Sequence, residues 1–131
     1  MNEKIELTRQ SFLAALSEMA ETKKVLIDTW VCCCSYGLAH EYQVEREFIN
    51  AMMQLTTPEE TLDTMRVKFE EIEKNLIECR EIFTKAERYD RANEYMVKEI
   101  ECRYMIQMLS NDDVWTNVCQ LYGDKIREAL T

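Results

Sequence analysis

Apolar residues recur with a heptad spacing in the middle of the chain, from Pro58 to Ala86. They stand three and four positions apart in alternation, at Leu62, Met65, Phe69, Ile72, Leu76, Cys79, Phe83 and Ala86. This spacing keeps one stripe of a helix facing a partner helix. At its start, Thr57 is the predicted N-cap, Pro58 fits the first helical position, and Glu60 completes a capping box. The pattern predicts a long helix that starts at residue 58.

A different apolar stripe occupies the second half of this helix. Heptad continuation requires apolar side chains at Asp90 and Asn93, and a new stripe follows at Val97, Ile100, Tyr104 and Met108. We therefore expect the helix over 58–109 to break near Asp90. Cap residues in Ser110–Asp113 predict its end and the start of a C-terminal helix over 111–130. Gly123 is a candidate division within that last helix.

The first part of the chain carries a broader stripe. Two rows of apolar residues at heptad spacing form it: Ile5, Phe12, Leu16, Met19, Leu26, Trp30 and Cys33, with Leu13, Ala20, Ile27 and Cys34 beside them. Such a stripe is typical of a helix that packs against two or more neighbours. Since no turn signal precedes Gly37, we expect a long helix over 2–56 that is kinked at Gly37 or continues through it. A true hairpin with its turn at this glycine is the alternative.

These elements predict an all-α fold, a single domain over residues 1–131. We expect an elongated helical bundle of four or five helices built on a long antiparallel helical hairpin, in which the stripe over 58–86 faces the stripe over 5–34. The turns between strands favour glycine and proline, and the chain has only two glycines and one proline, so it has few residues suited to such turns. Broad stripes are also often partly buried against another copy of the chain, so homo-oligomerisation is a further hypothesis.

The net charge is −9, with acidic residues spread along the chain among lysines and arginines. Nucleic acids and anionic lipids attract basic patches, so we expect neither direct nucleic-acid binding nor membrane binding. The first residues lack the basic and apolar regions of a signal peptide. No apolar run approaches the roughly 18 residues that span a bilayer. Six cysteines, three of them adjacent, are a poor disulfide framework, so we expect reduced thiols and a cytoplasmic protein.

The only histidine, His40, excludes many kinds of active site. A ferritin-like di-metal centre needs two Glu-x-x-His pairs, and haem held by two histidines is impossible within one chain. Two glycines cannot build a Gly-rich phosphate loop. We therefore expect no enzyme activity and no cofactor.

One metal site remains as a hypothesis. Cys33 and His40 share a face if the helix runs through Gly37, and Cys79 or Cys102 from another helix then completes a zinc site. Free cysteines are more often buried as small apolar side chains, so we expect Cys32–Cys34 to pack in the core.

These exclusions favour an intracellular, non-enzymatic protein–protein interaction module, such as an adaptor, an assembly factor or an inhibitor. Methionines adapt to irregular partners and aromatic residues anchor interfaces. The candidate interface residues are Met52, Met53, Met105, Met108, Trp115 and Tyr122, for which core filling is the competing interpretation. One alternative is an acidic nucleic-acid mimic that blocks a DNA- or RNA-binding protein, which requires its negative charge on one face. A second alternative is a helical metal-binding protein that uses His40 and cysteines.

Overall fold

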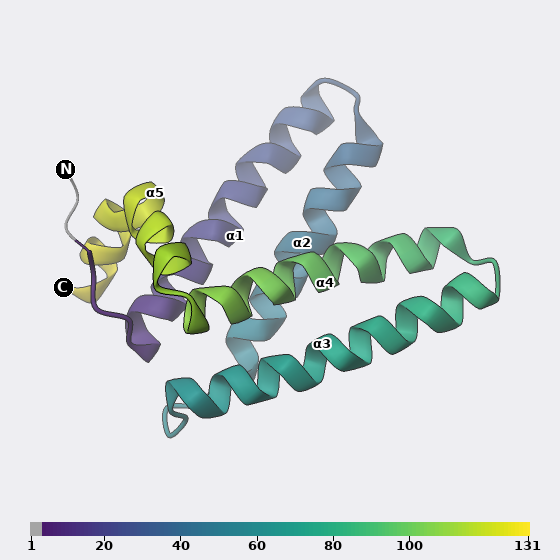
Figure 1. The fold of residues 1–131 in the computed structure, drawn as a ribbon. Helices are drawn as coiled ribbons and strands as arrows, with labels where there is room; N and C mark the ends of the chain where they lie inside the picture. Colours follow the sequence, from purple (N-terminus) through teal and green to yellow (C-terminus); the bar gives the residue numbers. More distant parts are fainter. Residues whose placement is uncertain (1–3) are drawn as a thin grey trace.

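A computed structural model describes residues 4–131, which form five helices and no strand (Figure 1). The helices are α1 (Arg9–Cys32), α2 (Tyr36–Leu55), α3 (Leu62–Lys85), α4 (Tyr89–Ser110) and α5 (Asp112–Leu130). The predicted all-α bundle is confirmed. No helix in residues 4–131 is long and apolar enough to cross a membrane.

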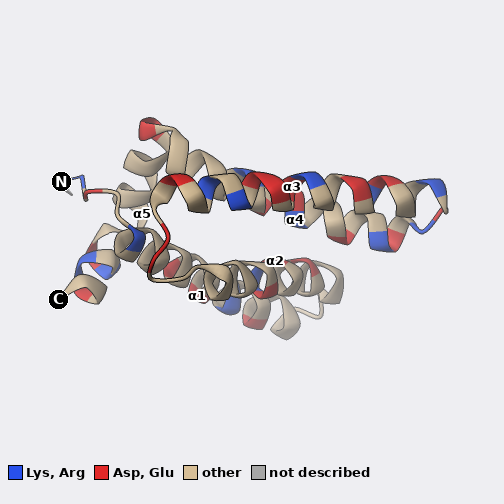
Figure 2. Cartoon of the chain, turned by 90° about the horizontal axis from the view of Figure 1, so that it is seen from below, with Lys and Arg blue, Asp and Glu red and all other residues tan. Residues whose placement is uncertain are grey.

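The helices form two antiparallel hairpins, α1 with α2 and α3 with α4. Figure 2 shows the two hairpins as two layers. Between the layers α2 contacts α4, and at one end α5 contacts both α1 and α4. The open end of each hairpin therefore lies in the body of the bundle, and the two hairpin turns project from it (Figure 1).

The core lies where the two hairpins meet α5. Its largest fully buried side chains are Trp115, Phe12, Phe69, Leu16, Ile49, Met52, Met65, Met105, Met108, Ile126, Val118 and Cys102. The rings of Phe12 and Phe69, 6.0 Å apart between centroids, join α1 to α3. Full burial of such a side chain stabilises the fold by about 1.5–3 kcal/mol, so these contacts fix how the hairpins sit on each other.

The prediction of one long helix over 2–56 was wrong. Residues 4–8 are extended and α1 starts at Arg9, while positions 2 and 3 lie outside the described residues. The chain turns back at Cys33–Ser35, so the hairpin alternative holds, but Gly37 lies inside the first turn of α2. The left-handed residue that closes α1 is Cys34, with φ of 60°. Because the turn was expected at a glycine, the left-handed conformation of Cys34 was not predicted.

The predicted helix start at residue 58 was also wrong. Thr61 is the N-cap of α3, in a capping box with Thr64. The backbone NH of Thr57 does donate to Oε1 of Glu60, over 2.8 Å, but this contact closes a turn before the helix. The predicted break near Asp90 lies at Ala86–Arg88, and α5 runs through a buried Gly123 without dividing.

The stripe of α3 faces α4 along most of its length, and not the stripe over 5–34. The rings of Phe83 and Tyr95 stack at 5.5 Å, and Sγ of Cys102 donates a hydrogen bond to the carbonyl of Phe69 over 3.3 Å. The expected contact with α1 is found at Phe12 and Phe69. The two halves of 58–109 are thus partners of each other, because the turn at Ala86–Arg88 folds them together.

The two hairpins repeat one design with an offset of 53 positions. Thr8 and Thr61 start α1 and α3 with the same capping box, and Cys34 and Glu87 close them with φ of 60° and 59°. Identical residues occupy equivalent positions of α2 and α4: Tyr36 and Tyr89, Ala39 and Ala92, Glu41 and Glu94, Tyr42 and Tyr95, Val44 and Val97, Met52 and Met105, and Gln54 and Gln107. Because of this internal repeat, each residue of one hairpin can be compared with the residue at the equivalent position of the other.

Candidate functional site

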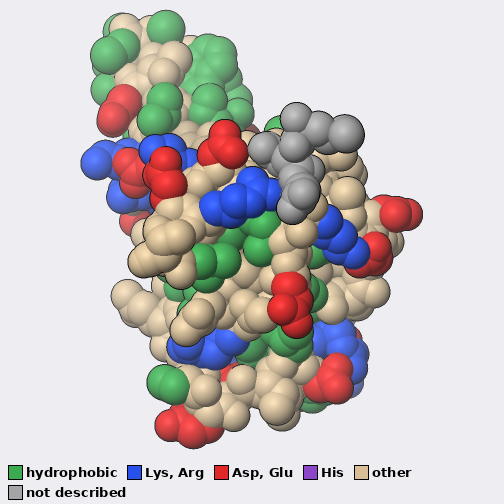
Figure 3. All heavy atoms as spheres, turned by 90° about the vertical axis from the view of Figure 1, so that its left-hand side faces the viewer, with side chains coloured by type: hydrophobic (Ala, Val, Ile, Leu, Met, Phe, Trp, Pro, Cys, Tyr) green, Lys and Arg blue, Asp and Glu red, His purple; other side chains and the backbone are tan. Residues whose placement is uncertain are grey.

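The turn of the first hairpin is apolar and exposed. No charged residue occurs from Thr29 to Ala39. We define the apolar tip as its exposed apolar side chains and free cysteines: Val31, Cys32, Cys33, Cys34, Tyr36 and Leu38. Tyr36 is 64% exposed and Leu38 41%. Figure 3 shows hydrophobic side chains gathered on this projecting end, at the top of the molecule.

Backbone hydrogen bonds hold the tip in a defined shape. The NH of Ser35 donates to the carbonyl of Trp30 over 2.8 Å, and the NH of Cys34 to that of Val31 over 3.0 Å. Together with the left-handed Cys34, these bonds form a Schellman motif, which satisfies the last carbonyls of α1. The tip is therefore an ordered surface.

The second hairpin builds the same turn from charged residues. Its equivalent bonds run from Arg88 to Phe83 over 2.8 Å and from Glu87 to Thr84 over 3.1 Å. Where residues 31–38 have no charge, residues 84–91 carry Lys85, Glu87, Arg88, Asp90 and Arg91. The guanidinium of Arg91 lies 5.6 Å from the ring of Phe83, and its equivalent in the first hairpin is Leu38. The turn therefore forms without an apolar tip, and the apolar character is a feature that the fold does not require.

The prediction that Cys32–Cys34 pack in the core was wrong. All three are exposed free thiols, whereas Cys79 is half-buried and Cys102 and Cys119 are buried. The apolar stripe of α1 continues beyond the part of the helix that other helices cover. Its buried residues end at Ala20, and nothing from Glu21 to Leu38 is buried. The spacing of apolar residues predicted the stripe of α1, but it did not predict where the other helices stop covering that stripe.

His40 and the cysteines do not form a metal site. Among residues 4–131, no three His, Cys, Asp or Glu side chains are grouped so that they could hold a metal ion. Nε2 of His40 lies 3.2 Å from Oε1 of Glu94 across the α2–α4 contact. The hypothesis required one continuous helix from Cys33 to His40, and the turn at Cys33–Ser35 leaves Cys33 outside the helix that carries His40.

The predicted interface residues lie mostly in the core. Met52, Met105, Met108 and Trp115 are at most 1% exposed in this chain. Met53 and Tyr122 are half-buried and pack against the same core. Core filling therefore accounts for most of these side chains, although Met108, Trp115 and Tyr122 also line pockets beside the core. The surface that sequence reasoning missed is the apolar tip, for which the absence of charge between Thr29 and Ala39 was the available signal.

A partly buried ionic cluster lies between the hairpins. Nζ of Lys23 on α1 lies 2.7 Å from Glu45 on α2 and 3.4 Å from Glu101 on α4, and 5.4 Å from the ring centroid of Tyr42. Burial raises the pKa of Glu101, and the charge of Glu45 adds to it against the opposing effect of Lys23. Burial alone lowers the pKa of Lys23, but the two carboxylates outweigh it and the pKa is raised. The cluster ties α1, α2 and α4 together.

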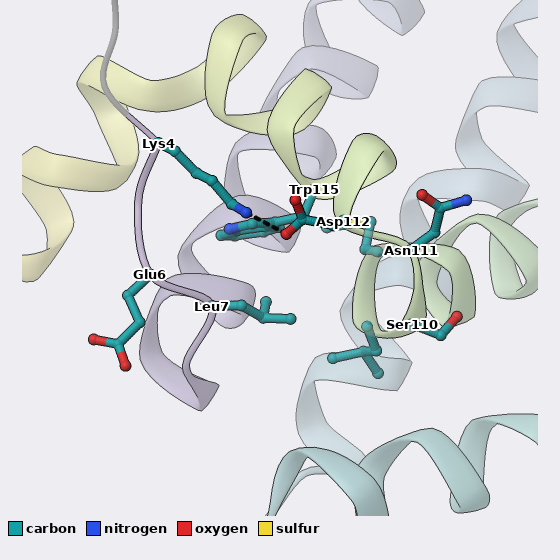
Figure 4. A pocket seen from close by; sticks show the side chains of 9 residues that line it. Lys4, Glu6, Leu7, Ser110, Asn111, Asp112 and Trp115 are labelled. Carbon is teal, nitrogen blue, oxygen red and sulfur yellow. Dashed lines mark hydrogen bonds and ion pairs between the residues drawn. The ribbon is translucent and has the colours of Figure 1, made fainter.

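Two pockets flank the core. One, of about 290 Å³, lies beside the ionic cluster and is lined by Met19, Thr22, Lys23, Ile100, Glu101, Tyr104 and Tyr122. The other, of about 350 Å³, lies between the N-terminal segment and the α4–α5 junction (Figure 4). There Lys4 pairs with Asp112, beside the indole of Trp115. The hydroxyl of Thr22 in the first pocket donates to the carbonyl of Glu18, and that of Ser110 in the second donates to the carbonyl of Ile106.

The charged residues are interleaved. Figure 2 shows Lys and Arg beside Asp and Glu along α3 and α4. Several are paired, such as Arg66 with Glu70 at 2.6 Å and Arg103 with Glu73 at 3.2 Å. A nucleic-acid mimic needs its negative charge gathered on one face. The interleaving on these helices gives that alternative no support.

Comparison of the chain with protein families, with curated proteins and with solved structures found no match. The case for a function therefore rests on the chain's own surfaces.

Proposed function

We propose that this chain is a non-enzymatic protein–protein interaction module, an adaptor, assembly factor or inhibitor, which docks through the apolar tip. One observation carries the proposal. The same turn, with the same hydrogen bonds and the same left-handed residue, is built from charged residues in the second hairpin and from apolar ones in the first. Exposed apolar surface that folding does not require marks an interaction site.

The chemistry of the tip defines the partner surface. The tip has no charge with which to form an ion pair, so the partner presents an uncharged, apolar face. Tyr36 provides an aromatic anchor of the kind that interfaces favour. Affinity then comes mainly from the burial of apolar area and depends little on salt. A charge mimic would instead lose affinity steeply as salt rises.

The cysteines of the tip support a reducing compartment for this function. Cys32, Cys33 and Cys34 are exposed and unpaired. Exposed free thiols persist where glutathione keeps them reduced, as in the cytosol. We therefore propose a cytoplasmic site of action.

The second hairpin supplies the variant that tests the proposal. In the quadruple variant Cys34→Glu, Ser35→Arg, Gly37→Asp and Leu38→Arg, the tip takes the residues of Glu87, Arg88, Asp90 and Arg91, which form the same turn. Helical circular dichroism and thermal melting check that it folds. The control variant, Glu87→Ala with Arg88→Ala, changes the other turn.

The experiment has two stages. Proteins retained from the native host by the wild-type chain are identified, purified and tested for direct binding by titration calorimetry. We expect the wild type and the control to bind equally, with little effect of salt, and the quadruple variant to lose at least tenfold in affinity. Equal binding by the quadruple variant would exclude the tip as the docking surface.

A further inference from the structure

We infer that the apolar tip docks on the same tip of a second copy of this chain, in a two-fold symmetric dimer. The inference rests on the proposed function, because it names the occupant of the same surface. In a two-fold interface each copy uses one patch, which must be complementary to itself.

The absence of charge at the tip meets that requirement. A patch that carries charge of one sign repels its own copy, whereas residues 29–39 have none. Elsewhere the chain carries a net charge of −9, which opposes self-association through other surfaces. Because the tip projects from the body (Figure 1), tip-to-tip contact also keeps the two acidic bodies apart, which reduces their repulsion. The tip is thus a surface that a second copy approaches with little repulsion.

The outer half of the first hairpin also lacks the neighbours that its sequence favours. Leu26, Ile27 and Trp30 continue the core stripe of α1, but they are only half-buried because two helices alone face each other there. A broad stripe favours packing against more than one neighbour. A second hairpin laid against this end provides two further helices of matching character, and a four-helix arrangement covers the stripe.

The area available is sufficient for such a dimer. The exposed side chains of the apolar tip present an apolar area on the order of 500 Å². Two copies then bury about 1,000 Å² in total, near the lower limit of specific interfaces. We therefore expect a weak, reversible dimer.

The experiment measures mass against concentration. Sedimentation equilibrium of the full chain should show 15.6 kDa at low concentration and twice that mass at high micromolar concentration. The control variant of the second turn should behave in the same way. Leu38→Arg, a single change that copies Arg91, should stay at 15.6 kDa throughout. Because it keeps all six cysteines, it also allows a second readout.

The second readout is the rate at which a maleimide labels Cys32–Cys34. In the wild type this rate should fall severalfold as protein concentration rises, since a dimer covers the tip. In Leu38→Arg it should not change with concentration. Leu38→Arg that dimerises like the wild type would overturn the inference, because another surface then mediates the contact.

The outcomes separate this inference from the proposed function. A wild type that stays at 15.6 kDa and binds a purified partner through the tip overturns the dimer alone. A wild type that stays monomeric and sediments with neutral phosphatidylcholine vesicles, when Leu38→Arg does not, overturns both. In that case the tip is a lipid-binding surface.

Discussion

The indole of Trp115 on α5 donates a hydrogen bond from Nε1 to the backbone carbonyl of Ile5, over 2.7 Å. The bond joins the extended N-terminal segment to the last helix, at the edge of the core. Ile5 and Leu7 pack against that core from the same segment. The other tryptophan, Trp30, has a buried Nε1 with no hydrogen-bond partner in residues 4–131. The two tryptophans therefore contribute differently to stability.

We predict that Trp115→Phe destabilises the chain more than Trp30→Phe does. The first change removes the indole donor and leaves the carbonyl of Ile5 only the weak contact from Sγ of Cys119, over 4.0 Å, at a cost of about 1–3 kcal/mol. The second removes an unpaired buried NH, so its cost is below about 1 kcal/mol. Urea unfolding measures both, and proteolysis of residues 4–8 reports on the segment. Equal destabilisation by the two changes would show that ring volume, and not the hydrogen bond, decides the outcome.

The turn of the first hairpin has a non-glycine residue where glycine is favoured. Cys34 has φ of 60°, whereas Gly37 lies in α2, and a Cβ on Gly37 would meet no atom within 4 Å. We predict that Cys34→Gly raises the free energy of unfolding by about 1 kcal/mol, since only glycine adopts this conformation without strain. Gly37→Ala should raise it by about 0.5 kcal/mol through helix propensity.

Thermal and urea unfolding of the two variants decide this prediction. Glu87→Gly, at the equivalent position of the second turn with φ of 59°, should match Cys34→Gly. If Cys34→Gly instead lowers the free energy of unfolding, strain in the left-handed conformation of Cys34 does not limit the stability of the turn.

Periodicity predicted the helices well because the burial of one stripe decides where a helix forms. It failed at the turns because that information lies in the backbone: Cys34 and Glu87 adopt a conformation that neither residue signals. The spacing of apolar residues also does not show whether another helix packs on a stripe. Cys33 was therefore expected in the core, although it lies in the part of the stripe that no other helix covers. Comparison of the chain with itself at an offset of 53 would have aligned Tyr36 with Tyr89 and revealed the charge difference between the turns.

The ionic cluster makes stability depend on pH. The pKa of Glu101 is raised in the folded chain above the ordinary glutamate value of 4.5, chiefly by burial. The folded state therefore binds this proton more tightly than the unfolded state does. Its contribution to stability is full below pH 4.5 and is lost as pH rises through the raised pKa.

We predict that Glu101→Gln changes this dependence. The amide cannot ionise, so it carries neither the cost of a buried carboxylate nor the repulsion by Glu45. Relative to the wild type, the variant should become progressively more stable as pH rises from about 4 to about 7. Urea unfolding at several pH values gives the difference, in which the groups common to both proteins cancel. A difference that is constant over this range would mean that Glu101 titrates alike in both states.

The six cysteines should fall into classes that follow their burial. We predict that Cys32, Cys33 and Cys34 react with iodoacetamide in the folded, dilute protein, and that Cys79 reacts more slowly. Cys102 should not react until the chain unfolds. Burial, with the charge of Glu73 adding to it, raises its pKa to about 12, and a thiolate is required for the reaction.

Mass spectrometry of digested, labelled protein assigns each site, and labelling in urea gives the reference for full reactivity. Cys119 serves as a second buried thiol, 1% exposed, on a different helix. Labelling of Cys102 as fast as Cys33 would mean that α4 opens from α3, because the Cys102 thiol is held against the carbonyl of Phe69 in their contact. Slow labelling of Cys33 together with Cys102, even in dilute protein, would mean that the apolar tip is covered. The thiols thus report separately on the core and on the surface through which we propose the chain acts.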